Sequence, residues 1–83
     1  MAHFLFFARV RETIGQAQME ITLPEAVHTV TDMLVFLRQR GAPFAAALAG
    51  AHLRVAVNQV YALPDDPVHD GDEVAIFPPV SGG

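Results

Sequence analysis

The 83-residue sequence predicts an α+β fold in which a mixed β-sheet packs against one main helix. Two observations predict it. Short segments that alternate polar and apolar residues, as half-buried strands do, occur before and after residues 30–40. Within that middle segment, four apolar residues recur at the spacing i, i+3, i+4 and i+7: Val30, Met33, Leu34 and Leu37. This spacing places one apolar stripe on a helix, and a single long helix between strands is typical of a sheet that wraps around it.

Two strands and a turn of helix are expected before the main helix. Residues 3–10 are rich in aromatic residues and apolar at both parities, which indicates a strand covered on both faces. Residues 9–15 are expected to form a helical turn that Gly15 closes. Residues 19–23 alternate cleanly and stop at Pro24, which cannot donate a backbone hydrogen bond to a sheet. The two strands suit a hairpin with a long connection.

The main helix has recognisable ends. Thr29 is the expected N-cap, and Asp32 lies three residues later, where its carboxylate completes a capping pattern. Gly41 suits the position after the last turn, and Pro43 cannot continue the helix. Residues 44–48 are expected to add a short second helix.

Three further strands are expected after the helices. Residues 53–58 alternate, and the dipeptide Asn58-Gln59 makes the turn into a short edge strand at residues 60–63. The last strand, residues 73–77, follows the tight-turn dipeptide Asp70-Gly71. The resulting order of strand, strand, helix, strand, short strand, strand is that of the β-grasp, or ubiquitin-like, fold.

The core is expected where the helical stripe meets the inward faces of the strands. The side chains predicted to be buried are Val30, Met33, Leu34 and Leu37 with Phe4, Phe6, Ile21, Val55, Val57, Val74 and Ile76. Truncating such a core leucine costs about 2–5 kcal/mol.

The outward face of the same sheet is expected to bind a protein. It carries His3 on the first strand and Glu73 on the last, which mark it as solvent-facing. It also carries four apolar residues: Leu5, Phe7, Ala75 and Phe77. Pro78 and Pro79, directly after the last strand, are expected to contact the same partner. Exposed apolar patches of this kind mark interfaces. The alternative is that the two phenylalanines, Phe7 and Phe77, form a second small core.

Composition and charge argue against several classes of function. Without cysteine there is no disulfide, thiolate metal site or cysteine nucleophile. A net charge of −4 argues against nucleic acid and is compatible with docking to basic protein surfaces. No apolar run approaches the roughly 18 residues of a membrane helix, and the start lacks the basic region of a signal peptide. We therefore expect a soluble, cytoplasmic protein.

Other polar residues carry no recognisable chemistry. The four histidines, His3, His28, His52 and His69, lack close metal-ligand spacing. The acidic residues between 65 and 73 lack the spacing of a calcium loop, so turn and surface roles are expected. Nothing resembles a phosphate-binding loop, so no bound cofactor is expected and any ATP belongs to a partner.

The end of the sequence is the candidate functional element. Pro78 and Pro79 end the last strand, since neither has an N–H group for a sheet. We expect residues 1–79 to form the domain and residues 80–83 a flexible tail: Val80, Ser81, Gly82 and Gly83. Four extended residues reach roughly 13 Å, and two terminal glycines without Cβ atoms suit a narrow channel. The tail therefore has the form of an arm that presents a terminal carboxylate.

Four segments together resemble a known family: residues 6–12 (FFARVRE), 56–59 (AVNQ), 70–74 (DGDEV) and 77–83 (FPPVSGG). They are similar to the small sulfur-carrier subunits of molybdopterin synthase, the MoaD family, over nearly the whole chain. The resemblance implies that an ATP-dependent enzyme, related to the ubiquitin-activating enzymes, adenylates the carboxylate of Gly83. Sulfur is then installed as a thiocarboxylate. The tail enters the large synthase subunit and gives sulfur to cyclic pyranopterin monophosphate, which forms the dithiolene of molybdopterin.

Three other readings remain open. The chain could be another β-grasp sulfur carrier, such as that of the thiamine pathway, although those are typically shorter and lack the Phe-Pro-Pro-Val ending. It could be a ubiquitin-like modifier that is joined through Gly83 to lysine amines. It could also be a plain binding module with an incidental tail. As a synthase subunit it would have no activity alone, because activation and catalysis belong to its partners.

Overall fold

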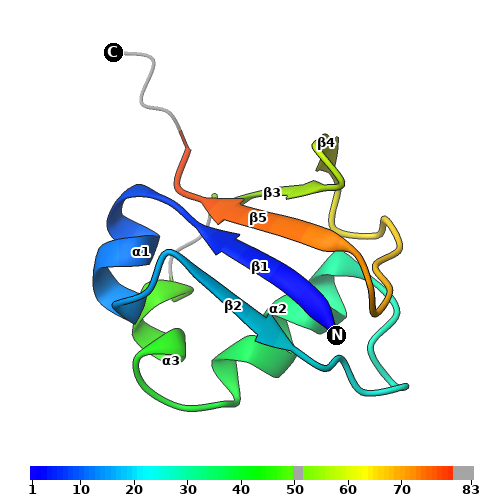
Figure 1. The fold of residues 1–83 in the computed structure, drawn as a ribbon, viewed down its shortest axis with the longest axis horizontal. Coiled ribbons are helices and arrows are strands. Elements are labelled where there is room, and N and C mark those ends of the chain that lie inside the picture. The colour runs from blue at the N-terminus through cyan, green and yellow to red at the C-terminus, as the bar shows by residue number, and fades with distance from the viewer. Residues whose placement is uncertain (50–51, 80–83) are drawn as a thin grey trace.

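The computed structural model describes residues 1–49 and 52–79. Five strands and three helices follow one another along these residues (Figure 1). They are β1 (Ala2–Phe6), α1 (Ala8–Ile14), β2 (Gln18–Ile21), α2 (Val30–Arg38), α3 (Phe44–Ala47), β3 (Arg54–Val57), β4 (Val60–Ala62) and β5 (Glu73–Phe77). The expected order of elements is confirmed, and most boundaries shift by one or two residues.

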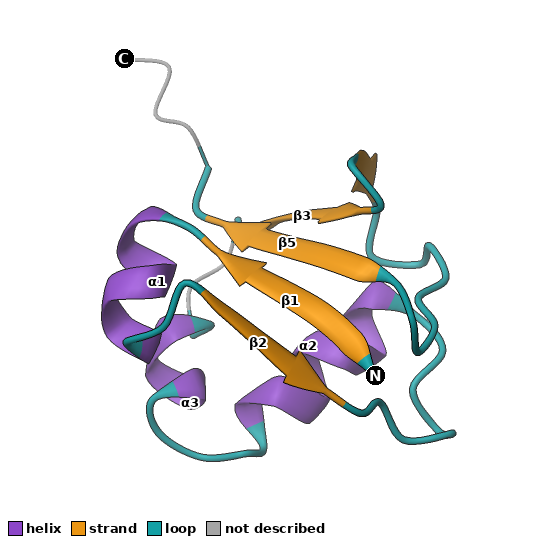
Figure 2. Cartoon of the chain, in the orientation of Figure 1, coloured by secondary structure: helices purple, strands orange, loops and turns teal. Residues whose placement is uncertain are grey.

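The strands form one mixed sheet in the order β2-β1-β5-β3-β4. The two central strands, β1 and β5, run parallel, and every other neighbouring pair is antiparallel. Helix α2 crosses one face, and α1 and α3 pack together at the end where β1 and β5 finish (Figure 2). This is the β-grasp arrangement. The expected edge strand, β4, does lie at an edge of the sheet.

The first strand is shorter than predicted. Residues 3–10 were expected to be extended, but β1 ends at Phe6 and α1 begins at Ala8. Ala8 has φ 52°, in the left-handed region, where the chain turns from strand to helix. Val10 and Ile14 are buried one helical turn apart. The apolar residues at both parities therefore belong to two elements, and the predicted helical turn closed by Gly15 (φ 88°) is confirmed.

The start of α2 forms as predicted, whereas the helix ends one residue earlier than expected: its C-cap is Gln39, so Gly41 does not directly follow the cap. Oγ1 of Thr29 accepts a hydrogen bond from the backbone N–H of Asp32 at 3.1 Å. The Asp32 carboxylate in turn accepts from the backbone N–H of His28 at 3.1 Å and of Thr29 at 3.3 Å. These hydrogen bonds lower the pKa of Asp32, and the bond from His28 has the largest effect. After the helix, Gly41 has φ 94°, a conformation that suits glycine.

The core lies between α2 and the inward face of the sheet. Nine of the eleven predicted core side chains are buried: Phe4, Phe6, Ile21, Val30, Met33, Leu37, Val55, Val74 and Ile76. The prediction was wrong for Leu34 and Val57, which pack against the core but are only half-buried. Leu34 faces the open groove between α2 and the β3–β4 hairpin, so one side of its side chain stays accessible.

Two leucines on α2 therefore differ in how deeply they are buried. Leu37 is fully buried, so Leu37→Ala should lower the free energy of unfolding by about 2–5 kcal/mol. Leu34→Ala should cost clearly less, since a half-buried side chain leaves a smaller cavity. Urea unfolding of both variants measures the difference. Equal losses at the two positions would mean that Leu34 is as enclosed as Leu37.

Candidate functional site

A row of small and apolar side chains crosses the outward face of the sheet. Leu5 pairs in register with Ala75, Ala75 with Ala56, and Ala56 with Tyr61. The neighbouring residues on β1 and β5 are buried on the opposite face, so this row faces away from α2. Residues from four strands thus meet on one surface.

Three aromatic rings, one of them Tyr61 of that row, gather on the side of the row where β1 and β5 finish. The ring centroid of Phe77 lies 6.3 Å from that of Phe7, at an interplanar angle of 86°. It lies 6.0 Å from the ring of Tyr61. Phe7 is 45% exposed and Tyr61 73% exposed. The predicted contact between the two phenylalanines exists, but it leaves aromatic surface open to solvent.

We call this surface the outer apolar face and define it by Leu5, Phe7, Tyr61, Ala75 and Phe77. Four of its members were candidates from the sequence, and the structure brings them together. Tyr61 was missed. The Asn58-Gln59 turn fixes the pairing of Tyr61 with Ala56, so the parity of the hairpin could have placed it on this face. Its role as a docking face stays a prediction.

The backbone around Phe7 holds its ring in this position. The N–H of Phe7 donates to the backbone oxygen of Ile76 at 3.2 Å, which extends the pairing of β1 with β5 by one residue. The next residue, Ala8, takes the left-handed conformation, which costs a non-glycine residue about 1 kcal/mol. The chain therefore leaves the sheet just after Phe7 and leaves the ring beside Phe77.

Two of the motifs noted in the sequence bind one another. The Asn58 side chain donates to Oδ1 of Asp72 at 3.0 Å and accepts from the backbone N–H of Glu73 at 3.0 Å. The backbone N–H of Asn58 donates to the oxygen of Glu73 at 2.7 Å. Asn58 has φ 51° and Gln59 φ 70°, which confirms the predicted turn. These motifs join the β3–β4 hairpin to the start of β5, a structural role that positions the outer apolar face.

Asp70 joins three segments of the chain. One carboxylate oxygen accepts from the backbone N–H of Leu23 at 3.0 Å, and the other lies 3.0 Å from the amino group of Met1. Both interactions favour the ionised form and lower the pKa of Asp70 below its ordinary 3.8. The hydrogen bond from Leu23 has the larger effect. The predicted tight turn follows, with Gly71 at φ 99°.

The two lowered carboxyl pKa values predict acid sensitivity. A group whose pKa is lower in the folded state stabilises the fold above its unfolded pKa. That stabilisation is lost as the pH falls below about 3.8 and through the lower folded value. Urea unfolding between pH 2 and 6 should therefore show stability that declines below about pH 4, and Asp70→Asn should flatten this decline.

A matched control is Asp65→Asn. The Asp65 carboxylate makes none of the side-chain hydrogen bonds found within residues 1–49 and 52–79. The control should keep the acid dependence of the unmodified chain. An unchanged pH profile in Asp70→Asn would show that Asp70 is not held as an ion in the fold.

The end of β5 lies beside the outer apolar face. β5 ends at Phe77, followed by the half-buried Pro78 and the exposed Pro79. Pro79 is the last described residue before the tail. The predicted tail residues Val80, Ser81, Gly82 and Gly83 lie outside the described residues.

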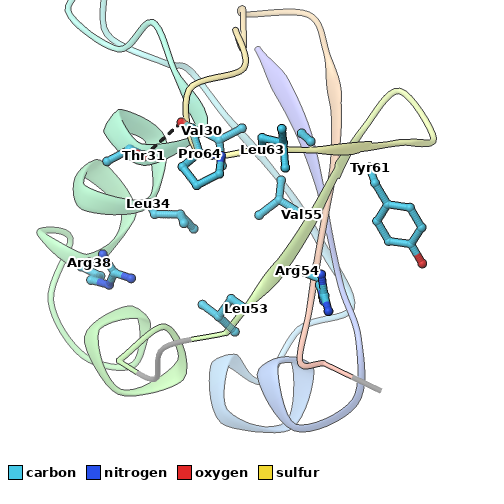
Figure 3. Close-up of a pocket in the computed structure, with 11 residues that line it drawn as sticks. Val30, Thr31, Leu34, Arg38, Leu53, Arg54, Val55, Tyr61, Leu63 and Pro64 are labelled. Atoms are coloured by element: carbon cyan, nitrogen blue, oxygen red, sulfur yellow. Dashed lines mark hydrogen bonds between the residues drawn. The ribbon is translucent and has the colours of Figure 1, made fainter. Parts of the chain in front are cut away.

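A groove of about 370 Å³ lies on the other side of the hairpin, between α2 and β3–β4 (Figure 3). Leu34, Val55 and Leu63 line its middle, and Arg38 and Arg54 lie at one end. No carboxylate, histidine or cysteine is among the described residues that line it. Tyr61 also borders the groove, but Figure 3 shows its ring directed away from the other lining residues. The groove thus lacks acid–base or metal-binding groups.

Residues 1–49 and 52–79 contain neither a metal-binding cluster nor a helix that could span a membrane. No three side chains of histidine, cysteine, aspartate or glutamate come close enough together to hold a metal ion. The longest helix there, α2, has nine residues, whereas about 20 are needed to cross a bilayer, so none of these helices could do so.

Comparison with known proteins gives one family and close relatives. Residues 4–83 match the model of the ThiS family. The molybdopterin synthase sulfur carrier subunit of Escherichia coli is 41% identical over 83 residues, and that of Haemophilus influenzae 40%; each alignment covers both chains completely.

Solved structures agree on the fold. A putative molybdopterin converting factor subunit 1 from Pyrococcus furiosus is 30% identical, with a TM-score of 0.74 over 95% of this chain and 97% of that one. SAMP1, from Haloferax volcanii, is 28% identical with the same TM-score over 99% and 98%.

Proposed function

Because the chain belongs to the ThiS family and is a full-length homologue of the molybdopterin synthase sulfur carrier subunits (the MoaD family), we propose that it carries sulfur for that synthase. The end-to-end match at 41% identity is the observation that carries this proposal. It includes the Gly82-Gly83 ending, on which the chemistry depends.

The proposed cycle begins at the carboxylate of Gly83. A carboxylate is a poor electrophile, so an activating enzyme joins it to AMP from ATP and releases pyrophosphate. A sulfur nucleophile then displaces AMP, which leaves a thiocarboxylate. The large synthase subunit receives the arm, and the sulfur passes to cyclic pyranopterin monophosphate. The chain has no cysteine, so it cannot form an internal thioester, and both partners are required.

The described residues supply the parts that such a carrier needs. The outer apolar face offers a contact surface beside the start of the arm. Pro78 and Pro79 restrict the base of the arm, which reduces the entropy lost when it enters a channel. We propose that ATP binds to the activating enzyme and not to this chain. We also propose that the cycle takes place in the cytoplasm, where ATP is available to that enzyme.

Intact mass tests the proposal. The protein is incubated with its activating enzyme, ATP and sulfide, and should gain the mass of one oxygen-to-sulfur exchange. The loaded protein should then form molybdopterin from the cyclic precursor when the large subunit is added. No mass gain, or gain without transfer to the precursor, would reject the assignment.

A second candidate is a protein modifier joined through Gly83 to lysine amines. SAMP1 of Haloferax volcanii is named as a small archaeal modifier protein, and the likeness to it over nearly the whole chain supports this second candidate. Mass spectrometry of cell extracts for Gly83 in isopeptide linkage distinguishes the two. The thiamine-type carrier ranks lower, because the full-length relatives described above are synthase subunits. A plain binding module would keep its function without Gly82 and Gly83.

A further inference from the structure

All five basic residues of the chain are arginines, and the fold gathers them at one end of the molecule. Arg9 and Arg11 lie on α1, directly after the end of β1. Arg54 opens β3 and is the register partner of Phe77, the last residue of β5. All three residues are exposed. Figure 1 shows α1 and the start of β3 at the end of the sheet where β5 finishes.

Arg38 and Arg40 reach the same end through α3. Nε of Arg38 donates to the backbone oxygen of Leu48 at 2.8 Å. The guanidinium of Arg40 lies 5.4 Å from the ring centroid of Phe44. That ring packs against Phe6, the last residue of β1. We call the five residues together the arginine end.

Eight of the nine carboxylates lie at the opposite end. They are Glu20, Glu25, Asp32, Asp65, Asp66, Asp70, Asp72 and Glu73. Glu20 and Glu73 both pair in register with His3, at the start of β1. The backbone of Asp66 accepts from Val30, where α2 begins. Glu12, on α1, is the single acidic residue that shares the arginine end.

This separation makes the protein strongly dipolar. Counted over side chains alone, five arginines and Glu12 give the arginine end a formal charge of +4, and the other eight acidic side chains give −8, which together make the net −4. The Met1 amino group adds one positive charge at the acidic end. Among residues 1–49 and 52–79, none of the ion pairs involves an arginine. The longest extent is 37 Å, several times the Debye length of about 8 Å at physiological salt, so a partner senses the two ends separately.

We propose that the arginine end docks on carboxylates of the partner surface around the opening that receives the arm, and so guides the arm toward that opening. The net charge alone suggested basic partner surfaces, but the charge nearest the arm has the opposite sign. Arginine suits this role, since its planar guanidinium binds carboxylates in a bidentate manner. The field would orient the carrier before contact, so that the arm leads. This inference rests on the proposed function, because it requires a partner that receives the arm.

Association kinetics test it with a matched pair of variants. The double change Arg9→Gln and Arg11→Gln makes the net charge −6, and so does Thr22→Glu with Ala26→Glu. The latter residues are exposed and lie on the acidic loop after β2. Stopped-flow binding to the large subunit and to the activating enzyme is measured at 20 and 200 mM salt. The arginine variant should associate about fivefold or more slowly at low salt with at least one partner, and the control should change little.

A readout without any partner uses cation-exchange resin at pH 7 and low salt. The unmodified chain should be retained despite its net charge of −4, and the arginine variant should elute earlier than the control. The inference would be overturned if the two variants associated at equal rates while the unmodified chain still bound its partners and accepted sulfur. That result would leave the proposed function standing. Failure of the unmodified chain to bind either partner would reject both. A third result would also overturn the inference: the unmodified chain binds a single-stranded oligonucleotide, the arginine variant does not, and both associate with the protein partners at the same rate.

Discussion

Deleting Gly83 should abolish sulfur transfer and leave the fold intact. The deletion moves the terminal carboxylate back by one residue, roughly 3.3 Å, so it would no longer reach the reacting atoms in a partner. Every buried side chain of the described core lies before Phe77, so the free energy of unfolding should stay the same. Molybdopterin formation with both partners measures the first effect, and urea unfolding measures the second.

Two further variants test whether transfer requires the free terminal carboxylate and a narrow, flexible backbone before it. One residue added after Gly83 would bury its carboxylate in a peptide bond and should also abolish transfer. Gly82→Val keeps the carboxylate but widens the arm and restricts its backbone, so it should slow transfer without preventing adenylation. If the variant without Gly83 formed molybdopterin at the normal rate, the sulfur would reside elsewhere and the proposed function would fall.

Phe77→Ala and Phe7→Ala should weaken partner binding far more than they weaken the fold. Aromatic residues at the centre of an interface commonly contribute 2 kcal/mol or more, so the dissociation constant should rise about 30-fold or more. Phe7 is 45% exposed, and the loss in folding free energy should stay near that of one aromatic contact, about 1 kcal/mol. Titration calorimetry with the large subunit and urea unfolding measure the two effects.

Val35→Ala is the matched control. Val35 is 43% exposed, much as Phe7 is, but it lies on α2, on the other face of the sheet. Its truncation should leave partner binding unchanged. Losses of similar size in binding and folding for the phenylalanine variants would instead support the alternative that Phe7 and Phe77 form a second small core.

The predictions that the structure confirmed rest on local chemistry. The Thr29 capping box, the turn at Asn58-Gln59 and the glycine after α1 each need only a few adjacent residues. The apolar stripe on α2 depends on helical periodicity alone. Such signals act within about one turn of the chain, so they can be read without knowledge of the rest of the fold.

The misses involve residues whose surroundings are set by distant segments. The end of β1 was placed too late because apolar residues at both parities fit a covered strand as well as a strand followed by a helix. Leu34 has the right periodicity, but the groove beside the β3–β4 hairpin leaves it half-buried. Tyr61 joins the outer apolar face only through the pairing of β4 with β3 and of β3 with β5.

The order of strands and helices, the capped main helix and most of the core could be predicted from the sequence alone, and the two terminal glycines on which the proposed chemistry depends are visible there as well. Only the tertiary structure decided which side chains share a surface. Sheet pairing brings Phe7, Tyr61 and Phe77 together across 70 residues of chain. The same packing gathers arginines from α1, α2 and β3 at one end of the molecule. Net charge is a sum over residues, whereas the field that a partner meets depends on where the fold puts each charge.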